Sequence, residues 1–286
     1  CDWIYEAFLD NKPMDRFVTE LILMGGSKFG GGPAGFGMAT QNDVPMAAKA
    51  YVIGSAFLGT NLQCARCHDA PYHPFMQADL FGMAAMLDRK AMKVPPTSII
   101  APTTAGARKS LVEVTLKPGS SVPPTWGFAT LSNPSALTPF LGNEKDSRER
   151  LAALVTSPAN KRFSQVIANR LWKRLFGIGL IDSADDWHDE HPSHPELLEY
   201  LGRELVLRGY DLKSLARLIL NSHAYQRQTS PHAASPSIST KPLFAAQHRR
   251  RFTAEQIVDG LHHATGLPMK VGELNMDRDG GLGPNT

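Results

Sequence analysis

The chain has 286 residues, of which 42% are hydrophobic, so it can bury a substantial core and indicates one large domain or two smaller ones. Its 30 basic and 27 acidic residues are scattered and leave a formal net charge of +3, which predicts no nucleic-acid partner. Three cysteines are too few for a disulfide framework, and no run of about 18 apolar residues predicts a transmembrane segment.

Apolar residues recur at helical spacing through the N-terminal third, which predicts helices there. We expect a helical segment over residues 2–23 with a break at Pro13, and further helices over 44–58 and 76–87. The glycine-rich stretch 25–37 lacks the Gly-Lys-Ser/Thr ending of a phosphate-binding loop, so we expect a plain loop. Because the sequence starts within a helical pattern and ends on a glycine-rich stretch, we expect it to be a piece of a longer polypeptide.

The character of the sequence changes between about residues 94 and 140, where prolines are frequent. Val112, Val114 and Leu116 alternate with polar residues in the period-two pattern of a half-buried strand. We therefore expect a β-containing connector, residues 94–140, between a helical N-terminal region (1–93) and a helical C-terminal region (141–286). The fold class expected for the whole chain is mainly α.

The C-terminal region contains the start and stop signals of several helices. Short polar side chains cap the helix starts, and glycines or prolines end the helices. The expected helices run from Asp146 to Pro158, Phe163 to Phe176, Ser193 to Gly209, Asp211 to Tyr225 and Thr253 to Thr265. A linker rich in serine, proline and histidine, residues 230–242, precedes the last of them.

The string Cys64-Ala-Arg-Cys67-His68 is the pattern by which proteins attach c-type haem. Two thiols add to the vinyl groups of the porphyrin, and the adjacent imidazole binds the iron as an axial ligand. Two residues between the cysteines allow both sulfurs to meet one edge of the ring, and the same turn carries the imidazole beneath it. We therefore expect one covalent haem held by Cys64 and Cys67, with His68 as a ligand of the iron.

Two other uses of this string are weaker. A redox dithiol normally lies at the start of a helix in a βαβ setting, and no such pattern surrounds Cys64. A zinc site needs two further thiolate or imidazole ligands, and the sequence has no second Cys-x-x-Cys, so His73 or a distant histidine would have to complete it. Haem is the interpretation that we favour.

The sixth ligand of the iron is left open by the sequence. The methionines within reach are Met76, Met83, Met86 and Met92. Met83 and Met86 lie three residues apart on an expected helix, so both can face one cavity, one as the ligand and the other packed on the ring. His73 is another candidate, although its closeness to His68 would demand a sharp chain reversal. A five-coordinate iron with an open face would favour small-ligand or peroxide chemistry.

A second concentration of polar residues lies between Asp182 and Glu196. It holds three histidines among carboxylates, at spacings compatible with metal binding: His188, His191 and His194. We favour an acidic turn before a helix N-terminus, because the helix dipole stabilises carboxylates there. Arg170 on the preceding helix is expected to form a partly buried ion pair with Asp185 or Asp186.

The string Phe57-Leu-Gly-Thr-Asn-Leu-Gln-Cys-Ala-Arg-Cys-His-Asp69 resembles the cytochrome-like region of large secreted planctomycete proteins of unknown function, the DUF1549 family. The second half resembles its usual companion, the DUF1553 domain, in Asn169–Leu180, Asp185–Trp187, Pro192–Leu198, Gly209–Lys213 and Arg251–Gln256. The resemblance covers nearly the whole chain and is least distinct in the connector. Many members have a second histidine where this chain has Ala70, which leaves His73 as the nearest substitute.

This resemblance implies an exported haem protein, but no settled activity. We expect a c-type cytochrome module that carries single electrons in the periplasm or another extracytoplasmic compartment, with a redox protein and further domains or subunits as partners. One alternative is a haem oxidoreductase that acts on a peroxide or an extracellular polymer. Another is an interaction module in which the haem mainly holds the fold together.

Overall fold

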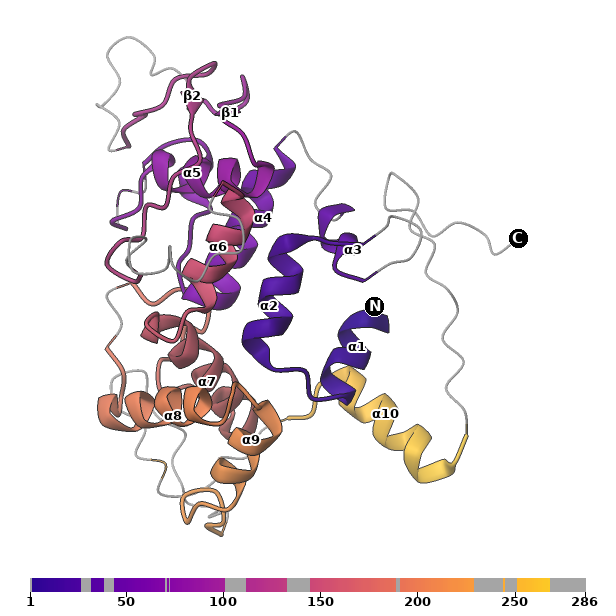
Figure 1. Cartoon of the computed structure of the whole chain (residues 1–286). Helices are drawn as coiled ribbons and strands as arrows, with labels where there is room; N and C mark the ends of the chain where they lie inside the picture. The colour runs from indigo at the N-terminus through magenta and orange to yellow at the C-terminus, as the bar shows by residue number, and fades with distance from the viewer. Residues whose placement is uncertain are drawn as a thin grey trace. The chain divides into compact units, whose positions relative to one another are not determined.

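The computed structural model of the chain describes residues 2–26, 32–38, 44–69, 71, 73–100, 112–132, 145–188, 191–228, 244 and 251–267. These residues belong to two compact units, 1–247 and 248–286. The described chain is mainly helical, as expected, with a small two-stranded sheet (Figure 1). Cys1 and the expected linker at 230–242 lie outside the described residues.

The N-terminal part of the larger unit is built from short helices. They are α1 (Asp2–Leu9), α2 (Met14–Leu23), α3 (Ala34–Met38), α4 (Pro45–Ile53) and α5 (Gln77–Asp88). Pro13 separates α1 from α2, as predicted, because its backbone is extended (φ −53°, ψ 135°). The helix α3 falls in the stretch for which only a loop was expected.

Two helical turns that are not α-helical connect α4 to the Cys-x-x-Cys-His motif, one wider than an α-turn and one tighter. The helix α4 continues into a π-helical turn, η1 (Gly54–Leu58), which ends at Gly59 in the left-handed conformation (φ 58°). A single 3-10 turn, η2 (Cys64–Arg66), follows. The helix predicted over 44–58 is therefore confirmed in extent, but its last turn is wider than an α-turn.

The prediction of a strand around Val112–Leu116 is wrong. The sheet instead pairs β1 (Met92–Lys93) with β2 (Ser121–Val122) in antiparallel register. Residues 112–116 are alternately half-buried and exposed, as the period of two suggested. Their backbone, however, bonds to the segment that follows the Cys-x-x-Cys-His motif, through Asp69 and Gln77, and not to another strand.

The C-terminal part of the larger unit contains α6 (Ser147–Thr156), α7 (Lys161–Phe176), α8 (Pro195–Leu207) and α9 (Leu212–Leu220). Asp146 and Asp211 cap α6 and α9 as predicted, because their carboxylates accept backbone N–H groups of the first turn. A cap that the sequence analysis missed, Asn160, starts α7 two residues before the expected Phe163.

Two predicted boundaries in this part are displaced. The N-cap of α8 is His194 and not Ser193, because the Ser193 hydroxyl donates to the carbonyl oxygen of Leu180 (3.1 Å). The helix α9 ends at Leu220 and does not reach Tyr225. There the Ser222 side chain donates to the Ile219 carbonyl (2.6 Å) and competes with the helical bonding pattern.

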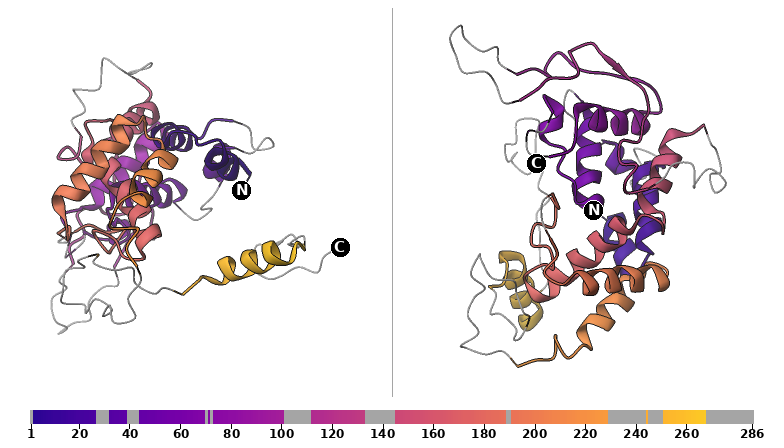
Figure 2. Two further views of the ribbon diagram at one scale, coloured as in Figure 1. Left: turned by 90° about the horizontal axis from the view of Figure 1, so that it is seen from below. Right: turned by 90° about the vertical axis from the view of Figure 1, so that its left-hand side faces the viewer.

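One hydrophobic core connects the early and late helices of the larger unit (Figures 1 and 2). The helix α6 packs against α2 and α5, although it follows the connector in sequence. The helix α7 packs against α8 and against the π-helical turn η1. The segment that leads into the Cys-x-x-Cys-His motif is therefore held by residues from the C-terminal part of the chain.

The smaller unit contains α10 (Ala254–Thr265). Its predicted capping box is confirmed: the Gln256 N–H donates to Oγ1 of Thr253 (3.2 Å), and the Thr253 N–H donates to Oε1 of Gln256 (3.1 Å). The helix ends at Gly266 in the left-handed conformation. Within the ranges described above, no helix combines the length and apolarity needed to cross a bilayer.

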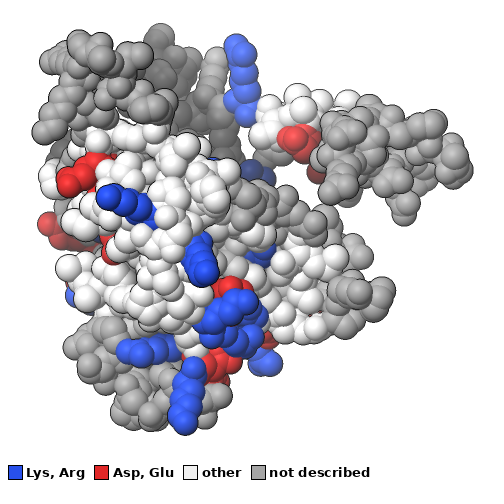
Figure 3. Space-filling view, turned by 90° about the horizontal axis from the view of Figure 1, so that it is seen from above, with Lys and Arg blue, Asp and Glu red and all other residues white. Residues whose placement is uncertain are grey.

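Surface charges of both signs are interspersed. On the face drawn in Figure 3, basic side chains stand beside acidic ones instead of forming a field of one sign. Exposed pairs such as Lys161–Glu199 show the same mixing, and isolated surface pairs contribute less than about 1 kcal/mol to stability. The informative polar groups are therefore those in the interior.

Candidate functional site

The Cys-x-x-Cys-His motif forms a compact turn anchored in the core. The backbone N–H groups of Cys67 and His68 both donate to the carbonyl oxygen of Cys64, at 3.1 and 3.2 Å. Ala65, between the two cysteines, is fully buried. The side chain of Cys64 is exposed and that of Cys67 is half-buried, and neither is in a disulfide. The turn therefore offers two accessible thiols from a fixed backbone.

The imidazole of His68 is held in one tautomer. Its Nδ1 lies 2.8 Å from the carbonyl oxygen of Asp69. A carbonyl oxygen can only accept, so Nδ1 carries a proton, and in the neutral imidazole the lone pair is therefore on Nε2. Within the described chain no further hydrogen bond of this ring is found. This is the state in which a histidine binds a metal ion through Nε2 while a second group orients the ring.

Asp69 fixes the segment after the motif, a role that the sequence analysis missed. Its N–H donates to the Glu113 carbonyl oxygen (2.8 Å). Its Oδ1 accepts from the N–H of Gln77 (2.7 Å) and from the Thr115 hydroxyl (3.0 Å). Asp69 thus ties the histidine turn both to the start of α5 and to the extended segment 112–116. Only its position directly after His68 signalled such a role.

The two methionines proposed as sixth ligands lie in the core. Met83 and Met86, on α5, have exposed fractions of 0% and 2%. The helix α5 packs against η2, so it does contact the motif turn. Met76, at the start of α5, is 56% exposed. Burial gives Met83 and Met86 a packing role of their own, and the choice of sixth ligand stays a prediction.

His73 faces the C-terminal part of the chain. Its Nε2 lies 3.5 Å from Oδ2 of Asp186, and its ring centroid lies 4.7 Å from that of His188. Its Nδ1 is buried and has no hydrogen-bond partner among the described residues. The sequence analysis named His73 as a candidate metal ligand and placed Asp186 and His188 in the separate segment Asp182–Glu196. Nothing in the sequence indicated that they lie in contact.

The histidines of the Asp182–Glu196 segment do not form one cluster. His188 lies against His73, whereas His194 contacts the Ser193 hydroxyl (3.2 Å) and the ring of Phe244. Among the residues that the structure describes, no group of three or more His, Cys, Asp or Glu side chains is arranged to hold a metal ion. Asp189 and Glu190, from the same segment, lie outside that description.

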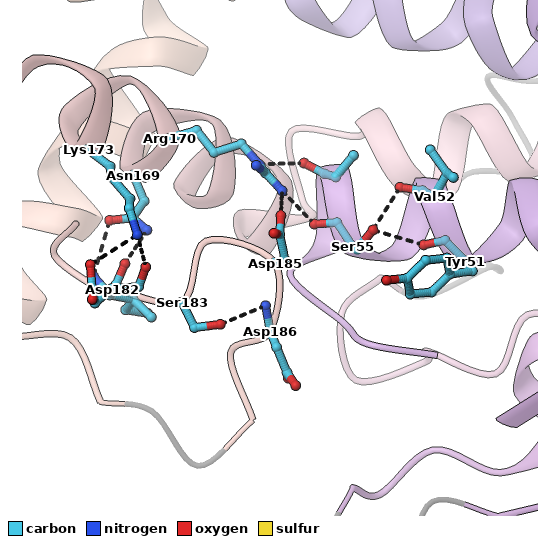
Figure 4. Close-up of polar contacts among 12 residues, drawn as sticks. Tyr51, Val52, Ser55, Asn169, Arg170, Lys173, Asp182, Ser183, Asp185 and Asp186 are labelled. Carbon is cyan, nitrogen blue, oxygen red and sulfur yellow. Dashed lines mark hydrogen bonds and ion pairs between the residues drawn. The ribbon is translucent and has the colours of Figure 1, made fainter. Parts of the chain in front are cut away.

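Arg170 pairs with Asp185, one of the two partners predicted (Figure 4). The Asp185 carboxylate is 73% exposed and the Arg170 side chain is 33% exposed, so the expected partly buried pair is buried on the arginine side only. The same guanidinium also donates to the backbone carbonyls of Ala56 (2.9 Å) and Ser55 (2.8 Å) in η1. Arg170 is therefore mainly an anchor for the π-helical turn that precedes the motif.

Asn169, the neighbour of Arg170 on α7, fixes the loop that carries Asp185 to Trp187 (Figure 4). It is fully buried. Its Oδ1 accepts from the N–H groups of Leu180 (2.8 Å) and Ile181 (3.1 Å), and its Nδ2 donates to the Ile181 carbonyl (2.8 Å). The side chain thus satisfies three backbone groups that would otherwise be buried without partners.

Trp187 is seated directly on Gly59. The backbone N–H of Trp187 donates to the Gly59 carbonyl oxygen (2.8 Å). A Cβ at position 59 would lie 2.8 Å from Cδ1 of the indole. Together with its positive φ, this close approach requires glycine there. The guanidinium of Arg162 lies 4.9 Å from the centre of the indole ring. Both side chains line a pocket of about 200 Å³ beside the motif segment.

Comparison with family models gives two matches. A model described as a protein of unknown function (DUF1549) matches residues 1–91, and another described as a protein of unknown function (DUF1553) matches residues 147–279. Together they cover more than three quarters of the chain. A search of curated proteins and a search of solved structures each found no match.

Proposed function

The chain belongs to the family that joins a DUF1549 region to a DUF1553 region, and we propose that it is a c-type cytochrome module that binds one haem covalently and carries single electrons. The observation that carries the proposal is the geometry of one turn. It offers two accessible thiols, at Cys64 and Cys67, and an adjacent imidazole whose tautomer leaves Nε2 available.

The residues present fit this cofactor. Cys64 and Cys67 would each give a thioether bond, and the buried Ala65 between them keeps the backbone of the turn in place. His68 would supply Nε2 to the iron, and the Asp69 carbonyl would hold the ring through Nδ1. When bound, the haem iron supplies one-electron redox chemistry. Zinc would need further ligands near the thiols, and no such ligand group forms among the described residues.

The same proposal gives the compartment and the partner class. Covalent attachment keeps haem from being lost in an extracytoplasmic compartment such as the periplasm, and a relay needs a second redox protein to give or take the electron. Further domains or subunits would bring the two together.

Intact mass under denaturing conditions tests the attachment. Protein made in a periplasm that contains the haem-attachment machinery should carry the mass of one haem and keep it after denaturation. The Cys64→Ala/Cys67→Ala double variant should have the mass of the bare polypeptide. Cys1→Ala is the matched control and should keep the pigment. A wild-type mass equal to that of the bare chain would contradict the proposal.

Absorption spectra of the reduced protein with and without carbon monoxide separate the relay from a haem oxidoreductase. A spectrum that carbon monoxide leaves unchanged indicates a six-coordinate iron and supports electron transfer. Ready binding of carbon monoxide indicates an open face and would favour catalysis on a peroxide or a polymer. In either case His68→Ala should change the absorption bands of the reduced haem. His191→Ala should leave these bands unchanged, because the His191 side chain is exposed.

A further inference from the structure

The pocket beside Trp187 has the lining of a binding site. It has a volume of about 200 Å³. Phe75 and Phe128 form part of an apolar wall, with ring centroids 5.5 Å apart, and Leu131 extends it. The polar lining includes Thr60, Arg162 and Trp187. Small-molecule sites usually combine an apolar wall with a few polar groups, and this pocket has both.

Arg162 brings a positive charge to this pocket without a counter-charge. The side chain is half-buried, and within the described part of the chain its contact is with the indole of Trp187, with no ion pair or hydrogen bond. Burial lowers the pKa of its guanidinium, and no carboxylate offsets that effect. A desolvated cation is costly unless an anion or hydrogen-bond acceptors meet it.

Two neutral donors at the same pocket are also unsatisfied. Trp187 is 6% exposed and Thr60 is 4% exposed. The indole Nε1 and the Thr60 Oγ1 are both buried and have no hydrogen-bond partner among the described residues. Most buried polar atoms in folded proteins have a partner. Thr60 and Trp187, each with a buried donor that lacks an acceptor, thus lie in the wall of the pocket that Arg162 also lines.

We propose that this pocket binds the carboxylate of a small aromatic or otherwise apolar organic acid. The planar guanidinium of Arg162 matches a carboxylate, and the indole of Trp187, over which it lies, helps to hold it at the pocket. The apolar wall around Phe75 and Phe128 would pack against the apolar part of the acid. An inorganic anion has no apolar part and would leave this wall in contact with water. The volume of about 200 Å³ restricts the ligand to a small acid, of which benzoate is a representative.

Isothermal titration calorimetry on the full chain tests this proposal, which does not depend on the haem. Benzoate is the probe, benzamide is its uncharged counterpart, and sulfate is an inorganic anion. We expect benzoate to bind and benzamide to bind at least about tenfold more weakly, which is about 1.4 kcal/mol, because the neutral amide cannot form a charge-assisted bond to the guanidinium. Equal binding of benzamide, preferential binding of sulfate, or no heat with benzoate at millimolar concentration would each overturn the proposal.

Variants locate the binding. Arg162→Gln should weaken benzoate at least about tenfold, while Arg150→Gln, an exposed arginine on α6, should leave it unchanged. Arg162→Lys keeps the positive charge but loses the planar pair of donors, and it should weaken benzoate less than Arg162→Gln does. If Arg162→Gln fails to fold, Arg162→Lys decides the question. Unchanged benzoate affinity in the variants that fold would overturn the assignment to this pocket.

Discussion

Two polar regions meet beside the Cys-x-x-Cys-His segment, and they differ in how completely their hydrogen-bonding groups are satisfied. Asn169 and Arg170, on α7, together bond five backbone groups of neighbouring segments. In the region around Trp187, the indole Nε1, the Thr60 hydroxyl and Nδ1 of His73 are buried without partners among the described residues. Each such group costs about 1–3 kcal/mol. The first region therefore holds the fold, and the second is suited to binding.

The largest effect on stability is expected at Asn169. Asn169→Ala strands two N–H groups and one carbonyl in the interior, so it should lower the free energy of unfolding by about 3 kcal/mol. The measurement is urea unfolding followed by circular dichroism. Asn221→Ala, which removes one exposed bond at the end of α9, is the control and should cost less than about 1 kcal/mol. A similar cost for both would break the distinction between the regions.

An intermediate effect is expected at Arg170. Arg170→Ala removes two backbone bonds to the π-helical turn and should cost about 2 kcal/mol. Asp185→Asn removes only the surface ion pair, whose carboxylate is 73% exposed, and should cost less than about 1 kcal/mol. Thermal unfolding of both variants compares the two contributions. Equal losses would mean that the ion pair, and not the anchoring of η1, stabilises this contact.

The smallest effect is expected at Asp186, beside the pocket. Asp186→Asn keeps an oxygen that can accept from the His188 N–H and loses only a long contact to His73, so it should cost less than about 1 kcal/mol. The same unfolding measurement applies. A loss as large as that of Asn169→Ala would show that the polar groups around the pocket also hold the fold, and the comparison between the regions would fail.

The helices could be predicted because their signals are local. Asp146, Asp211 and Thr253 each lie within three residues of the N–H that they cap, so one stretch of sequence contains the whole interaction. The strand expected at 112–116 failed for the opposite reason. Its alternation reports that one face is half-buried, whereas a strand also needs a partner, and the partners here are the backbone of Asp69 and the side chain of Gln77.

The candidate sites divide in the same way. Cys64, Cys67 and His68 are readable because the chemistry and the spacing lie in five consecutive residues. The contact of His73 with Asp186 and the stacking of Arg162 on Trp187 depend on tertiary packing. A single sequence names such residues, but it does not show which of them meet. That is why the partner of Arg170 could be predicted only as one of two residues, Asp185 or Asp186.

The anchoring of η1 by Arg170 also has a consequence for the order in which the chain matures. The bonds of Arg170 to Ser55 and Ala56 span 115 and 114 residues of sequence, so they form only after the chain has been made as far as α7. The turn at Cys64 depends on bonds between near neighbours and can form early. A nascent chain would therefore present Cys64 and Cys67 on a formed turn while the segment before them is still unanchored, so the proposed attachment of haem would precede the docking of the late helices.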